Sequence, residues 1–119
     1  MLKVVKFGGS SLANANQVMK VRDIVKSDPA RVAVVVSAPG KRFSKDNKIT
    51  DLLYLCYAHV KYGVDHTSVL ELIKSRYQEI VDGLGIELDV DGEFEQIEKN
   101  IDCVVSLRLS AILIQQLQQ

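Results

Sequence analysis

Two short runs of apolar, mostly β-branched residues near the start of the chain most constrain its fold. The first is LKVVKF (residues 2–7), and the second is RVAVVV (residues 31–36), which lies between Pro29 and Pro39. Runs of this length and composition predict β-strands. Their near-continuous apolar character is typical of strands that are buried on both faces, as in a parallel sheet with helices above and below.

The segment between the two runs predicts a helix. Valines recur at helical spacing within residues 14–26, and Asn14 or Asn16 can cap the helix start. A strand, a helix and a second strand in this order form a βαβ unit, in which the two strands are parallel. We therefore expect an α/β fold that begins with a βαβ unit and has a parallel-type sheet with flanking helices.

The rest of the chain predicts a loop and three further helices. Residues 37–48 (SAPGKRFSKDNK) are polar and basic, and they predict a long loop. Helices are predicted over residues 49–62, over residues 67–84, where the apolar stripe is clearest, and from Phe94 through Leu117. Residues 86–93 (IELDVDGE) are expected to form a linker or turn between the last two helices.

Length and composition limit the classes of protein that this chain can belong to. At 119 residues it is long enough for one compact domain. Its 15 basic residues balance its 15 acidic residues, so net charge does not favour nucleic acid or an anionic membrane as the main partner. Two distant cysteines indicate neither a disulfide scaffold nor a zinc site. With no signal-peptide pattern and no membrane-length apolar run, we expect a soluble, cytoplasmic protein.

The first strand ends in KFGGSS, which is a candidate phosphate site. Gly8 and Gly9 would allow close backbone approach and positive φ, Ser10 and Ser11 add hydroxyl donors, and Lys6 adds a positive charge. The alternative is a tight turn with a solvated lysine, and the residues alone give it about equal weight. Two common phosphate loops are excluded because the chain contains neither GxxxxGK[ST] nor GxGxxG.

Three motifs in the first half of the chain together resemble one family. VVKFGGSSLAN (residues 4–14), VVVSAPGK (34–41) and KITDLLY (48–54) occur in the order and at the separations seen in aspartokinases, of the amino acid kinase family. The resemblance is clear over about the first 60 residues and continues as a helical segment to about Asn100. It implies that residues 1–119 are the N-terminal portion of a longer catalytic domain, without regulatory ACT domains.

The resemblance also implies roles for individual residues. Lys6, Phe7 through its backbone, Gly8, Gly9 and Ser10 would bind the phosphates of ATP, and Lys6 would be the catalytic charge. No residue of this chain is assigned to a metal, although Mg²⁺ would accompany ATP as a cofactor.

Two further residues match hydroxyl groups that contact the amino-acid substrate in the family. Ser37 follows the second strand, and Thr50 begins the next helix. Without the resemblance, both are better explained as caps of a strand end and a helix start. The basic loop that follows Gly40 could close over bound anions with this glycine as a hinge, or it could simply be solvated.

The implied reaction is ATP-dependent phosphorylation of the side-chain carboxylate of L-aspartate to 4-phospho-L-aspartate, the first step of lysine, threonine and methionine biosynthesis. The partners would be these small molecules, and a homo-oligomer is expected. Near Ser106 the sequence VVSLRLSA departs from the family's Ser-x-Gly-Glu segment, which puts substrate anchoring in question, and we expect the isolated chain to be inactive. The alternatives are a non-catalytic α/β ligand-binding or interaction module, or a kinase acting on acetylglutamate or carbamate.

Overall fold

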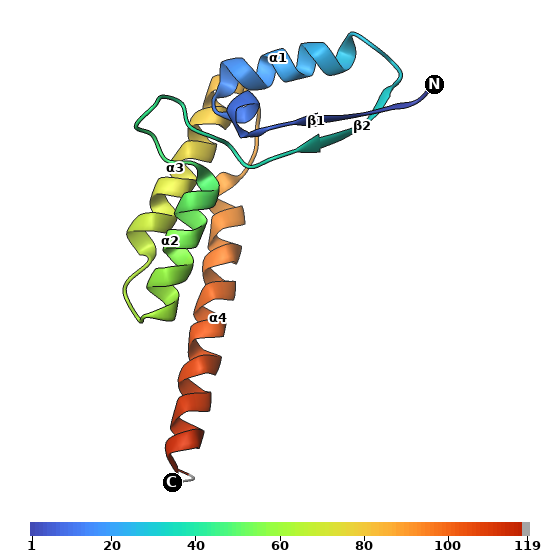
Figure 1. Ribbon diagram of the computed structural model, residues 1–119. Helices are drawn as coiled ribbons and strands as arrows, with labels where there is room; N and C mark the ends of the chain where they lie inside the picture. The colour runs from blue at the N-terminus through green and yellow to red at the C-terminus, as the bar shows by residue number, and fades with distance from the viewer. Residues whose placement is uncertain (118–119) are drawn as a thin grey trace.

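The computed structural model describes residues 1–117, with side chains described as far as Cys103. The elements in chain order are β1 (Lys3–Phe7), the 3-10 turn η1 (Gly9–Leu12), α1 (Ala15–Lys26), β2 (Arg31–Val36), α2 (Ile49–Lys61), α3 (Thr67–Leu84) and α4 (Val90–Leu117). Figure 1 shows two parts: the sheet with α1, and a layer of α2, α3 and α4, in which α4 extends well past its neighbours. The molecule is accordingly elongated, at 65 × 32 × 28 Å.

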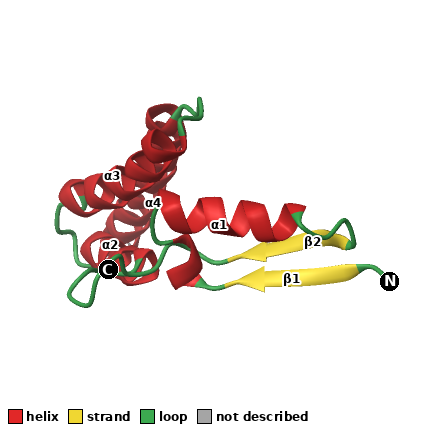
Figure 2. Ribbon diagram, turned by 90° about the horizontal axis from the view of Figure 1, so that it is seen from above, coloured by secondary structure: helices red, strands yellow, loops and turns green. Residues whose placement is uncertain are grey.

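The N-terminal part is the predicted βαβ unit. β1 and β2 pair in parallel, from Lys3 opposite Arg31 to Phe7 opposite Val36. α1 lies along one face of this two-stranded sheet (Figure 2). The side-chain oxygen of Asn14 accepts a hydrogen bond from the backbone N–H of Gln17 at 3.0 Å and so caps the start of α1. The prediction of an α/β fold with parallel strands is confirmed.

The expectation that both faces of the strands are buried is wrong for this chain. Val4 and Val32 are 72% and 59% exposed, and several other strand valines are also exposed. Among the described elements, α1 covers one face of the sheet and none covers the other. The apolar runs do form strands, as predicted. Their apolar composition shows that both faces are able to pack against other elements, but it does not show whether such elements are present.

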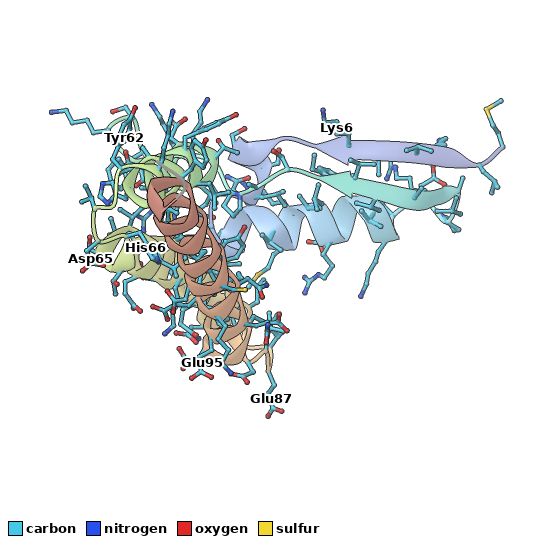
Figure 3. All side chains as sticks on the ribbon, turned by 90° about the horizontal axis from the view of Figure 1, so that it is seen from below. Lys6, Tyr62, Asp65, His66, Glu87 and Glu95 are labelled. Carbon is cyan, nitrogen blue, oxygen red and sulfur yellow. The ribbon has the colours of Figure 1, made fainter. Side chains whose placement is uncertain are left out.

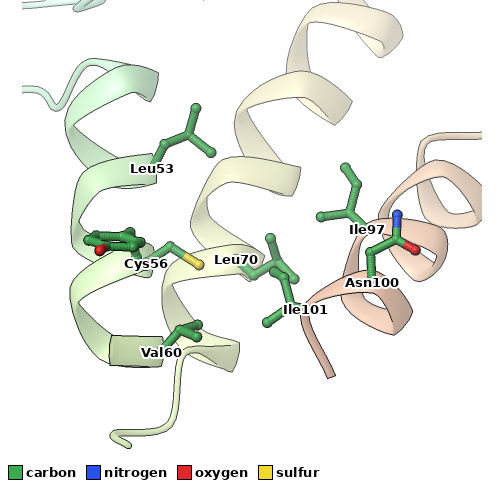
Figure 4. Close-up of a pocket in the computed structure, with 8 residues that line it drawn as sticks. Leu53, Cys56, Val60, Leu70, Ile97, Asn100 and Ile101 are labelled. Atoms are coloured by element: carbon green, nitrogen blue, oxygen red, sulfur yellow. The ribbon is translucent and has the colours of Figure 1, made fainter. Parts of the chain in front are cut away.

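The helical layer holds the main core. Ile49, Leu52 and Cys56 of α2 pack against Val69 and Ile73 of α3. α4 joins this layer through an aromatic contact in which the rings of Tyr77 and Phe94 lie 6.1 Å apart. Between α2, α3 and α4 runs an apolar groove of about 380 Å³, whose lining residues are shown in Figure 4. No helix within the described part of the chain is both long enough and apolar enough to span a membrane.

Helix boundaries follow the predictions closely, with one correction. α3 has the predicted bounds and ends at Gly85, which adopts the left-handed conformation (φ 64°) that favours glycine. α4 begins at Val90 and not at Phe94, so half of the predicted linker is helical. The Asp89 side chain accepts a hydrogen bond from the N–H of Gly92 at 2.9 Å, and Val90 is buried, which together start the helix earlier. The apolar residues Ile112, Leu113 and Leu117 of the predicted last helix have side chains outside the described set.

Candidate active site

Three chain segments meet around a polar pocket of about 450 Å³ at the carboxyl edge of the sheet. The pocket is lined by Gly9, Ser10, Ser37, Ala38, Pro39, Gly40, Lys41, Lys48 and Thr50. These residues come from η1, from the loop after β2 and from the start of α2. Since the carboxyl ends of parallel strands lie at the same edge of a sheet, residues that follow β1 and β2 are brought together here. Ligands of open α/β sheets bind at this edge.

Close backbone contacts hold the walls of the polar pocket. The N–H of Gly40 donates to the carbonyl oxygen of Gly9 at 2.8 Å, and the N–H of Ile49 donates to Pro39 at 3.0 Å. A Cβ atom on Gly40 would lie 2.7 Å from the carbonyl carbon of Gly9. This position therefore requires glycine for steric reasons. The contact also gives Gly40 a role other than that of a hinge.

The expectation of positive φ in the KFGGSS stretch is wrong. Gly8 has a φ of −76°, and Gly9 is not among the glycines with positive φ. The chain leaves β1 in an extended conformation and turns through η1, which forms ordinary right-handed 3-10 geometry. Gly9 is needed instead for close approach, because a Cβ atom there would lie 3.0 Å from the Ala38 carbonyl oxygen.

The chemistry of the polar pocket suits an anion. Its lining carries two lysines, Lys41 and Lys48, together with three hydroxyl side chains, and it includes no carboxylate. The N-terminus of α2 also lies at the pocket, through Lys48 and Thr50. Unpaired N–H groups at a helix N-terminus favour negative charge, and the lysines act in the same direction.

The structure brings together four of the seven residues that the sequence singled out. Gly9, Ser10, Ser37 and Thr50 line the polar pocket, whereas Lys6, Phe7 and Gly8 do not. Lys6 lies on β1 opposite Val35 and is exposed. In Figure 3 its side chain points away from the sheet on the side opposite α1. Lys41 and Lys48 supply the positive charge of the pocket lining.

The capping explanation for Ser37 and Thr50 receives no support from the geometry. α2 has Lys48 as its N-cap residue and no capping hydrogen bond from a side chain. Ser37 is held by its backbone, whose N–H donates to Phe7 at 3.1 Å. Within the described residues, neither hydroxyl makes a side-chain hydrogen bond, so both are free to face a ligand.

A network of ion pairs folds the basic loop onto α3. The carboxylate of Asp46 accepts hydrogen bonds from Arg42, from its Nε at 2.7 Å and from its backbone N–H at 2.9 Å. Arg42 Nη1 also lies 2.6 Å from Glu79 of α3. Hydrogen bonding from the Arg42 guanidinium and from backbone N–H groups holds the pKa of Asp46 well below its usual range. The same carboxylate raises the pKa of Arg42.

Arg76 is a structural residue of this region that is not among the residues predicted from the sequence. It is 4% exposed, and burial lowers the pKa of its guanidinium. Asp46 lies 3.3 Å from its Nη1 and provides the opposing charge. The signal was present in the sequence, because Arg76 lies at helical spacing from Ile73 and Ile80 on the apolar face of α3. A charged residue inside such a stripe indicates a buried, paired group.

The fold and the pocket define a class: an α/β protein with a candidate anion site at the carboxyl edge of a parallel sheet. The model of the amino acid kinase family matches residues 1–107. The chain belongs to this family.

Relatives and solved structures agree with this assignment. The chain is 51% identical over 83 residues to Aspartokinase 3 of Bacillus subtilis (strain 168). This match covers 70% of this chain and 18% of that protein. It is 27% identical over 101 residues to the bifunctional aspartokinase/homoserine dehydrogenase of Buchnera aphidicola subsp. Acyrthosiphon pisum, covering 66% of this chain and 12% of that protein. The crystal structure of Clostridium acetobutylicum aspartate kinase superimposes with a TM-score of 0.78 at 55% identity, over 82% of this chain and 23% of that one. The chain thus spans less than a quarter of the length of each.

Proposed function

We propose that residues 1–119 form the N-terminal portion of the catalytic domain of an aspartate kinase, and that the polar pocket receives the reacting anions. The supporting observation is that three motifs, separate in the sequence, meet in one pocket with two lysines and no carboxylate in its lining. The aspartokinase names of the relatives support the choice of substrate.

The proposed reaction transfers the γ-phosphoryl group of ATP to L-aspartate. An oxygen of the side-chain carboxylate attacks the γ-phosphorus, and the bond from that phosphorus to the β–γ bridging oxygen breaks, which leaves ADP and 4-phospho-L-aspartate. The attacking carboxylate has an ordinary pKa of about 3.9 and is already ionised, so it needs no general base. The task of the protein is to hold two anions in line and to neutralise their charge.

Roles follow for individual residues of the chain. Gly9 and Ser10 would hold the ATP phosphates with backbone N–H and hydroxyl donors, supported by the neighbouring Gly8 and the backbone of Phe7. Ser37 and Thr50 would hold the aspartate. Lys6 is exposed near the end of β1 and outside the pocket lining. Its catalytic role therefore depends on its side chain swinging toward the phosphates.

The residues that line the polar pocket do not fit a magnesium site. Magnesium prefers carboxylate and other oxygen ligands. The polar pocket has lysines in place of carboxylates, and the described residues contain no group of three histidine, cysteine or acidic side chains able to hold a metal ion. We therefore assign no residue of this chain to Mg²⁺, which would enter with ATP.

A chimaera tests the proposal directly. Residues 1–103 of this chain would replace the matching segment of the Clostridium acetobutylicum aspartate kinase, and ADP release would be followed with L-aspartate, N-acetyl-L-glutamate or carbamate as acceptor. We expect aspartate-dependent release from the chimaera and none from the 119-residue chain alone. A folded chimaera that is inactive with aspartate, or that prefers another acceptor, would contradict the proposal and favour one of the alternative functions.

Two further properties belong to the same proposal. An enzyme of this biosynthetic type would act in the cytoplasm, in keeping with two cysteines that are both unpaired. We also propose that the enzyme is a homo-oligomer. In the 119-residue chain, the exposed valines of the sheet favour self-association. Sedimentation of the chain over a range of concentrations would test this, and a monomer at the highest concentration would contradict it.

A further inference from the structure

We propose that Arg76 is a positioning residue: a single buried guanidinium that holds the three segments of the polar pocket in their relative places without lining the pocket itself. This inference rests on the proposed function for its catalytic consequence. The claim that Arg76 holds the three segments together rests only on the contacts of Arg76.

The contacts of Arg76 reach all three segments. Its Nη2 donates to the carbonyl oxygen of Gly40 at 2.6 Å and to that of Ala13 at 3.3 Å, and its Nη1 donates to that of Asn47 at 2.8 Å. Ala13 directly follows η1, Gly40 lies in the loop after β2, and Asn47 lies just before the start of α2. Gly40 lines the pocket itself, Asn47 precedes the lining residue Lys48, and Ala13 follows the turn that begins with the lining residues Gly9 and Ser10.

The geometry of these bonds requires arginine. A guanidinium is a planar fork with five N–H donors, so one side chain can reach acceptors in several directions at once. A lysine ammonium in the same place is a compact point charge and cannot bond all three carbonyl groups from one position. Asp46, 3.3 Å from Nη1, balances the buried charge, which would otherwise be costly.

The direction of these bonds also matters for the anion site. The N–H of Gly40 donates to Gly9, and its carbonyl oxygen accepts from Arg76. Hydrogen bonds therefore fix the peptide groups on both sides of Gly40. Lys41 follows at once, and Lys48 follows Asn47. Arg76 therefore anchors the backbone beside each of the two lysines of the pocket. A small shift there would misplace both charges.

Amide hydrogen exchange in the 119-residue chain gives a readout independent of catalysis. The N–H groups of Gly40 and Ile49 make the bonds that close the pocket walls. In Arg76→Lys and Arg76→Met we expect both amides to exchange at least about tenfold faster, while amides in the middle of α1 keep their rates. Arg22→Lys, the same substitution at an exposed arginine of α1, serves as the matched control and should change neither set.

The catalytic consequence is measured in the chimaera. We expect Arg76→Lys to lower kcat about a hundredfold at saturating substrates, because misplacement by about 1 Å has that effect on a reaction catalysed by positioning. Arg22→Lys should retain the parent rate. If the Arg76→Lys variant has the same kcat as the parent chimaera, the inference is overturned. A positive charge at this position would then be enough for catalysis, without the three hydrogen bonds that arginine makes.

The outcomes separate the two claims. If the parent chimaera is folded but inactive with aspartate, the proposed function fails, and the exchange experiment still decides the role of Arg76. Unchanged exchange at Gly40 and Ile49 would overturn the inference. Equal acceleration across α1, or failure of both variants to fold, would overturn it as well, because Arg76 would then stabilise the whole domain and not the pocket.

Discussion

The backbones of Gly9 and Gly40 are in direct contact, with the Gly40 N–H 2.8 Å from the Gly9 carbonyl oxygen. They lie 31 positions apart in the sequence, one after β1 and the other after β2. Their contact closes the polar pocket on one side and leaves no room for a side chain at Gly40.

Gly40→Ala should therefore destabilise the chain. The new methyl group would meet backbone atoms, which cannot rotate away, and overpacking of this kind costs about 1–3 kcal/mol. Urea unfolding of the 119-residue chain measures the change. Gly8→Ala is the matched control, because a Cβ there has nothing within 4 Å and its φ is −76°. Equal stability of the two variants would contradict the steric explanation.

Lys6→Ala should lower the kcat of the chimaera, with a loss of about 2–4 kcal/mol of transition-state stabilisation. The reason is that, in the proposed function, the Lys6 ammonium swings toward the transferring phosphoryl group and neutralises its charge. Folding should hardly change, since Lys6 is exposed. Steady-state kinetics and a melting curve check both points, with Lys20→Ala on the exposed surface of α1 as the control. Unchanged turnover in a folded Lys6→Ala variant would leave Lys41 and Lys48 as the charges that act on phosphate.

Thr50→Val keeps the shape of the side chain and removes the hydroxyl that would hold aspartate. In the chimaera, the KM for aspartate should rise about tenfold or more, the effect of losing a hydrogen bond to a charged group, and the KM for ATP should rise less. Initial rates with each substrate varied in turn measure the two constants. If both rise equally, Thr50 does not distinguish the substrates. Thr67→Val at the start of α3, away from the pocket, is the comparison.

Asp46→Asn should destabilise the chain by about 2 kcal/mol at neutral pH, because it weakens hydrogen bonds from a charged partner. Arg42 lowers the folded-state pKa of Asp46 below the unfolded value of about 3.9. The carboxylate therefore contributes its full stability well above this unfolded pKa, at about pH 5 and higher, and the contribution is lost as pH falls toward the folded pKa.

Urea unfolding at several pH values checks this dependence. The difference between the parent chain and Asp46→Asn should be largest at pH 5 and above and should shrink below about pH 4. Asp23→Asn, in an exposed pair with its neighbour Arg22, should have a small effect throughout. A constant difference between Asp46→Asn and the parent across this range would contradict the role given to the ionised carboxylate.

The local elements were readable from the sequence because their determinants are local. Apolar runs and helical spacing identified both strands and the helices of the chain, and Asn14 acts as an expected cap. The predicted start of α4 is four residues late, because the Asp89 side chain accepts a hydrogen bond from the Gly92 N–H and caps the helix within the predicted linker. The motifs after each strand also indicated, through the resemblance, that Gly9, Ser10, Ser37 and Thr50 belong to one site.

Only the tertiary structure decided how that site is held together. Arg76 bonds Ala13 across 63 positions and Gly40 across 36, and no periodicity within α3 contains that information. Lys6 is two positions before Gly8 in the sequence, and its role at the phosphates stays a prediction. The lysines that line the pocket are Lys41 and Lys48, which packing of the later segments brings there. Sequence spacing determines which residues share a face of one element. Which faces meet depends on contacts between distant segments, and these form only when the whole chain packs.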